Sequence, residues 1–165
     1  MSLTATIRCS ISADYERTVG GRQIVDDIPP TKDYQFGSGT GAGLADIAFS
    51  DHRTLASATS ENLDMSGGLT DAFGQTIVAL KVKAIEVHAD ETNTTNITVG
   101  AAASNTFVGP FNDATDAIVV KPGGRFVIAD PVGWTVTPAT ADILKVTNSA
   151  GAAGSYRIKI IAATA

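Results

Sequence analysis

Short runs of β-branched and aromatic residues recur through the second half of the chain, and Gly, Pro, Asn and Asp separate them. The spacing of these runs is close to the roughly eight to twelve residues typical of β-sandwiches. The runs cover residues 81–87, 96–100, 118–120, 125–129, 134–137, 143–147 and 156–161. We therefore predict an all-β fold, with an antiparallel β-sandwich or jelly-roll-like body.

The segment from Val78 to Ala89 shows how these runs are expected to pack. Apolar residues alternate with polar ones, and the phase changes by one residue at Ala84, which indicates a β-bulge. The predicted inward positions are Val78, Leu80, Val82, Ile85, Val87 and Ala89. Good helix formers between residues 75 and 88 leave a helix as the alternative, but the β-branched residues and the missing Gly cap favour a strand.

Turn residues predict how the strands are connected. Lys, Pro and two Gly at 121–124 predict a hairpin turn between the strand ending at Val120 and the one starting at Arg125. We interpret residues 57–64 and 66–71 as polar, turn-rich connections.

The first part of the chain differs from the rest in its residue pattern. We therefore divide the chain into an N-terminal arm and Gly-rich linker, 1–43, and a β-sandwich or jelly-roll domain, 44–165. Pro29 and Pro30 interrupt any strand ladder, and the glycine run at 37–43 reads as a flexible joint. The apolar residues of the arm, Ile7, Val19, Ile24 and Ile28, are too few for a core of their own. We expect them to dock on a partner or a neighbouring subunit, and we expect the body from Leu44 to stay folded without them.

Composition excludes some partners. A net charge of −5 opposes nonspecific binding to nucleic acid, which requires clustered Lys and Arg. The aliphatic stretches are far shorter than the roughly 18 apolar residues of a membrane span, so we predict neither a nucleic-acid nor a membrane partner. The single Cys9 cannot form an internal disulfide, and the N-terminus lacks the pattern of a secretion signal. We therefore expect synthesis in a reducing cytoplasm and a small buried thiol at Cys9.

Residues with catalytic or metal-binding potential are sparse, and we predict no catalytic residue, no cofactor and no metal site. His52 and His88 show no metal-ligand spacing, and we place His88 on a solvated sheet edge. A loop calcium site at Asp113 and Asp116, or at Asp90 and Glu91, stays open because hard cations need only clustered oxygens.

Trp134 is the only large aromatic platform. A place in the core or in an interface is the favoured interpretation, and a sugar-facing position is the alternative.

Several turns and strand ends resemble those of small structural proteins of tailed bacteriophages, with head decoration, or cement, proteins as the nearest match. The matching segments lie within residues 53–162 and are 60–74, 96–100, 107–111, 122–124 and 133–136. The resemblance implies a non-enzymatic homotrimer on the outer capsid surface of the virion, where it binds the major capsid protein and bridges its subunits. A phage tail or fibre component, or a carbohydrate-binding β-sandwich module, is the alternative.

Overall fold

The computed structural model describes residues 2–31 and 33–165. Within these residues the chain forms fifteen β-strands and no helix. The all-β prediction is confirmed, and the helical alternative for 75–88 is wrong, because this segment forms β9 (Thr76–Val78) and β10 (Lys81–Ala89). The described part of the chain accordingly has no helix of the length and hydropathy needed to span a membrane.

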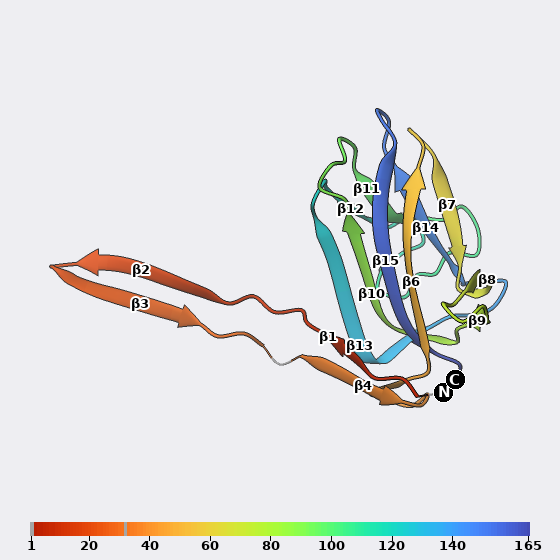
Figure 1. The fold of residues 1–165 in the computed structure, drawn as a ribbon, viewed down its shortest axis with the longest axis horizontal. Helices are drawn as coiled ribbons and strands as arrows, with labels where there is room; N and C mark the ends of the chain where they lie inside the picture. The colour runs from red at the N-terminus through yellow and green to blue at the C-terminus, as the bar shows by residue number, and fades with distance from the viewer. Residues whose placement is uncertain (1, 32) are drawn as a thin grey trace.

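Two four-stranded antiparallel sheets form the body (Figure 1). The first sheet has the order β13 (Arg125–Thr135), β10, β15 (Gly154–Ala163) and β6 (Ile47–Leu55). The second sheet has the order β12 (Ala117–Val120), β11 (Ile97–Gly100), β14 (Ile143–Asn148) and β7 (Ser60–Asp64). Counted along the chain, these eight strands are ordered 6-3-8-1 and 5-4-7-2, which is the arrangement of a jelly roll. The chain changes sheet at every connection between them except the one from β11 to β12.

The core lies between the two sheets and follows the period of two along the strands. In β15, alternate residues from Tyr156 to Ala162 are buried, whereas Arg157 and Lys159 are exposed. The second sheet contributes completely buried side chains such as Leu63 and Leu144. Each fully buried aliphatic side chain of this kind contributes about 1.5–3 kcal/mol relative to its exposed state, so this core dominates the stability of the body.

The predicted β-bulge is confirmed, because the register of β10 shifts between Val82 and Ala84 against both β13 and β15. Of the three inward positions predicted before the bulge, Val82 is buried as expected, whereas the predictions for Val78 and Leu80 were wrong. Val78 is 47% exposed and Leu80 is 37% exposed, whereas Ile77 and Ala79 are buried. The reason is that Val78 belongs to a separate small hairpin, formed by β8 (Ser66–Thr70) and β9, rather than to the β10 strand.

Two predicted connections are different in the structure. A turn does form at 121–124, where the Gly124 N–H donates to the Lys121 carbonyl at 2.7 Å, but it joins β12 to β13 across the two sheets and not within a hairpin. The polar run at 57–64 contains the edge strand β7, in which only Leu63 is fully buried. An edge strand with one solvated face buries so little apolar surface that its sequence resembles a loop.

A polar network joins the two sheets at the side of the sandwich where β6 and β7 are the outer strands. The completely buried Tyr156 donates its hydroxyl to Glu61 Oε1 at 2.7 Å, and Arg53 Nη1 lies 2.5 Å from Glu61 Oε2. Arg53 Nε also donates to Asp51 Oδ2 at 2.9 Å. Burial raises the pKa of the Tyr156 phenol, and the hydrogen bond to Glu61 and its charge raise it further.

We expect Tyr156→Phe to lower the free energy of unfolding by about 1.5–3 kcal/mol at neutral pH, the range for a hydrogen bond to a charged group. The change should also alter how the free energy of unfolding depends on pH under alkaline conditions. Because the folded pKa of Tyr156 lies above the unfolded value of about 10, its contribution is complete below pH 10 and declines as pH rises further, by up to about 1.4 kcal/mol per pH unit. Urea unfolding of the wild-type and Tyr156→Phe proteins at pH 7 and above pH 10 measures both free energies of unfolding. Equal alkaline slopes in the two proteins would contradict it.

Candidate functional site

A two-stranded hairpin extends away from the body and is the most prominent feature of its surface (Figure 1). It consists of β2 (Ala13–Val19) and β3 (Arg22–Ile28), which pair along their full length. The loop residues Gly20 and Gly21 have φ values of 57° and 79°, as a two-residue type I′ turn requires. Pro29 and Pro30 follow directly after β3 and end the ladder, as predicted from the sequence.

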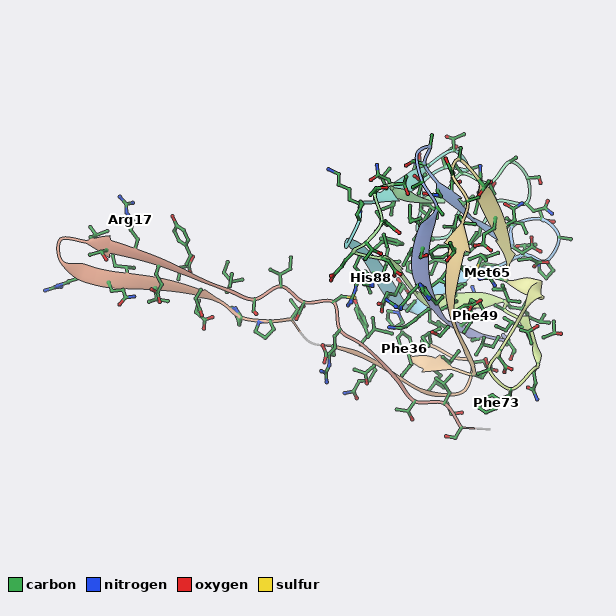
Figure 2. All side chains as sticks on the ribbon, turned by 45° about the horizontal axis from the view of Figure 1, so that its top comes forward. Arg17, Phe36, Phe49, Met65, Phe73 and His88 are labelled. Carbon is green, nitrogen blue, oxygen red and sulfur yellow. The ribbon has the colours of Figure 1, made fainter. Side chains whose placement is uncertain are left out.

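The hairpin has two chemically different faces, because directly opposed residues of an antiparallel pair share a face. The apolar face carries Ala13, Tyr15, Arg17, Val19, Arg22, Ile24, Asp26 and Ile28. The acidic face carries Asp14, Glu16, Thr18, Gln23, Val25 and Asp27. Figure 2 shows the side chains of both strands projecting into solvent, with no other described part of the chain beside them.

The apolar face is uncovered. Tyr15 is 69% exposed, Ile24 is 56% exposed, and Val19 and Ile28 are each 47% exposed. An isolated two-stranded hairpin is at best marginally stable in water. Exposed apolar side chains gathered on one face of such an element make it a candidate interaction surface.

Three of the four residues predicted to dock, Val19, Ile24 and Ile28, lie together on this apolar face. Ile7 does not join them. It lies in β1 (Ala5–Ile7) at the root of the arm and lines a groove of about 270 Å³ against the outer face of the first sheet, with Val127 and Ile161. That these residues bind a partner stays a prediction.

The sequence analysis did not select Tyr15. Among the large apolar side chains of β2 and β3, Tyr15 is the most exposed. The available signal was the alternation from Ala13 to Val19 directly before a two-Gly loop, which is typical of a hairpin.

The root of the arm is ordered, which differs from the flexible joint expected at 37–43. β4 (Tyr34–Ser38) pairs with β1 and, in parallel, with β5 (Leu44–Ala45). The Gly43 N–H donates to the Pro131 carbonyl at 2.9 Å, and the Gly37 N–H donates to the Gly43 carbonyl at 3.1 Å.

Lys83 fastens this root to the body. Its ammonium group donates to the Val132 carbonyl at 2.6 Å, and it also contacts the carbonyls of Gly41 at 3.3 Å and Pro131 at 3.4 Å. The side chain is buried, and the loss of hydration lowers its pKa. Three backbone acceptors compensate for that loss, and one of them, the Gly41 carbonyl, ties the glycine run to a residue 42 positions further along the chain.

Trp134 lies in β13 opposite Val82 and packs against the hydrophobic core in a half-buried position. This geometry favours the core interpretation over the sugar-facing one, because a stacking platform needs an open ring face.

The histidines and Cys9 are not assembled into a chemical centre. His52 Nε2 lies 3.0 Å from Asp90 Oδ2, and His88 stands opposite Arg125 and Arg157 in the interior of the first sheet. The placement of His88 on a sheet edge was therefore wrong, because β10 has a neighbour on each side. Cys9 is exposed, so the expectation of a buried thiol was also wrong, since the strand it was assigned to ends at Ile7.

The three aspartates considered for calcium already have partners within the protein. Asp113 accepts hydrogen bonds from the Thr115 N–H and hydroxyl at 3.0 Å, and these bonds lower its pKa. Asp90 pairs with His52 and Arg157. Across residues 2–31 and 33–165, no three His, Cys, Asp or Glu side chains are grouped as a metal ion would require.

Comparison with known proteins gives distant similarity only. No protein-family model matches the sequence, and neither does any curated protein. Among solved structures, a chain of the Bacillus endospore appendages, a family of disulfide-linked pili, is 15% identical with a TM-score of 0.39, over 78% of this chain and 97% of that one. A chain of the cyanophage Pam1 capsid asymmetric unit is 18% identical with a TM-score of 0.31, over 75% of this chain and 89% of that one. At TM-scores this low, the likeness assigns the chain neither to a family nor to a function.

Proposed function

We propose that this chain is a non-enzymatic structural protein of a virion, a decoration protein that binds the outer surface of the phage head and bridges major capsid subunits. The observation that carries the proposal is the projecting hairpin, whose apolar face is uncovered although the body has a complete core. The resemblance of residues 53–162 to head decoration proteins supports the head as the location.

The physical role of such a protein is to stabilise the assembled state. A molecule that binds only the assembled shell adds RT ln(1 + [L]/Kd) to its stability, about 2.7 kcal/mol per site at a hundredfold excess over Kd. The hairpin suits this role because burial of its apolar face occurs only on contact with another subunit. Attachment then buries the apolar face and stabilises a hairpin that is only marginally stable by itself.

A hairpin deletion tests the proposal. Replacing residues 11–30 by a short Gly-Ser turn should leave the body folded and reduce its occupancy on stripped phage heads at least about tenfold, since the apolar face supplies contacts within the assembled shell. Electron microscopy of decorated heads measures occupancy, and circular dichroism checks the body. Full occupancy by the protein that lacks the hairpin would show that the hairpin has no role in attachment. Labelling confined to the tail would replace the head location by the tail or fibre alternative.

A further inference from the structure

A hollow of about 320 Å³ lies at the base of the body, where the residues before β1, the start of β6 and the turn between β8 and β9 meet. Its lining includes Asp46, Asp71 and Phe73. Phe73 is 74% exposed, more than any other large apolar side chain from residue 44 onward, and Figure 2 shows it at the surface of the body.

The hollow combines apolar surface with fixed negative charge. Asp46 accepts hydrogen bonds from the Thr164 N–H at 2.9 Å and the Thr164 hydroxyl at 2.6 Å. Asp71 accepts from the N–H groups of Phe73 at 2.9 Å and Gln75 at 2.8 Å. Both carboxylates are therefore held in position beside Phe73, and the described residues that line the hollow include no Lys or Arg.

The end of the hairpin has the complementary chemistry. On its apolar face, Val19 and Ile24 stand opposite Arg22 and Arg17, so two cations alternate with two aliphatic side chains close to the turn. Within the described residues neither arginine has a carboxylate at salt-bridge distance. An occupant for this surface should thus offer apolar contacts together with carboxylates.

We propose that the hairpin end of one copy docks in the base hollow of a second copy. The apolar face covers Phe73, and Arg17 and Arg22 approach Asp46 and Asp71. A copy cannot fill its own hollow, because the hairpin points away from the side of the body where β8 and β9 lie (Figure 1). The contact is head-to-tail, which closes into a ring or continues as a filament. A closed ring of three agrees with the trimer that the resemblance implies.

This inference rests on the proposed function only in assigning the hairpin to assembly. In assembly, the hairpin would link copies of the chain to one another. Several weak attachments to a shell would then act together through avidity. It can fail while the hairpin still binds the capsid directly, and the test below separates the two because it contains no capsid.

The test uses the full chain and measures self-association by sedimentation velocity over a range of concentrations. Ile24→Asp should weaken association at least about tenfold, whereas Val25→Asp, which alters a similarly exposed residue of the acidic face, should leave it unchanged. Phe73→Asp should weaken it to the same degree. Its control is Val119→Asp, a change at a 56% exposed residue on β12.

Mixing provides the decisive measurement. The Ile24→Asp protein keeps an intact hollow and the Phe73→Asp protein keeps an intact hairpin, so the mixture should form a one-to-one dimer although each protein alone is monomeric. A wild-type chain that stays monomeric up to its solubility limit would overturn the inference. Association that Phe73→Asp leaves intact, or a mixture that does not form the dimer, would overturn it as well.

Discussion

A chain shortened to begin at Leu44 is expected to lose at least about 3–5 kcal/mol of its free energy of unfolding, whereas a chain that lacks only the hairpin should keep nearly all of it. Phe36 in β4 is 1% exposed, and removal of a buried phenylalanine alone costs this much. The shortened chain also loses the acceptor that Gly41 offers to the buried Lys83 ammonium. This change therefore also tests the prediction that the body from Leu44 onward stays folded without residues 1–43, because Phe36 and Gly41 contribute contacts to it.

Urea unfolding of three proteins measures this difference: the full chain, the chain without residues 1–43, and the chain in which a Gly-Ser turn replaces residues 11–30. Phe36→Ala in the full chain is the control that isolates the buried ring from the backbone contacts. Equal midpoints for the full chain and the chain without residues 1–43 would contradict the expectation. A large loss on removal of the hairpin alone would show that β2 and β3 stabilise the body.

Asn148→Asp is expected to destabilise the body by about 3–5 kcal/mol near neutral pH, the range for an uncompensated buried charge. Asn148 occupies an inward position of β14 and is completely buried. Its side-chain N–H groups donate to the carbonyls of Leu55 at 3.2 Å, Ala56 at 3.0 Å and Ala152 at 2.8 Å. A carboxylate of the same shape cannot donate and would face these three oxygens with a negative charge.

The pH dependence of the Asn148→Asp protein gives the clearest signature. The introduced carboxyl group should have a folded pKa above its unfolded value of about 3.9, so its destabilising effect should grow as pH rises above 4 and fade below it. Thermal unfolding between pH 3.5 and 7 follows this change. Asn62→Asp, at an exposed position of β7, is the matched control and should shift stability by less than about 0.5 kcal/mol. A similar loss in both variants would argue against burial as the cause.

The sequence predicted the fold class and the bulge, because alternation reports directly which side chains face a core. It did not predict which strands pair. The glycines at 121–124 specify a tight turn but not whether the next strand returns to the same sheet, and here β12 and β13 separate to opposite sheets. That choice depends on long-range pairing with β10 and β11, about which the turn residues carry no information.

The candidate site was predictable in part. Val19, Ile24 and Ile28 stand out as apolar residues without a local core, and period-two alternation is sufficient to place them on one face. The fixed conformation of the glycine run at 37–43 was not predictable. It depends on a contact with Lys83, and the residues around Lys83 in the sequence do not indicate that contact. The same holds for Ile7, whose groove is completed by strands far along the chain.

The pairing of β6 has a consequence for synthesis on the ribosome. β6 pairs with β15 and with no other strand of its sheet, and 99 residues separate Leu55 from its partner Gly154. At about 5–20 residues per second, β6 waits roughly 5–20 seconds before its partner is made. The hairpin of β2 and β3 needs only neighbouring residues and can form within about 1–10 μs. During each round of translation the assembly element can therefore form early, while Phe49 and Leu55 of the unfinished body still require shielding from aggregation.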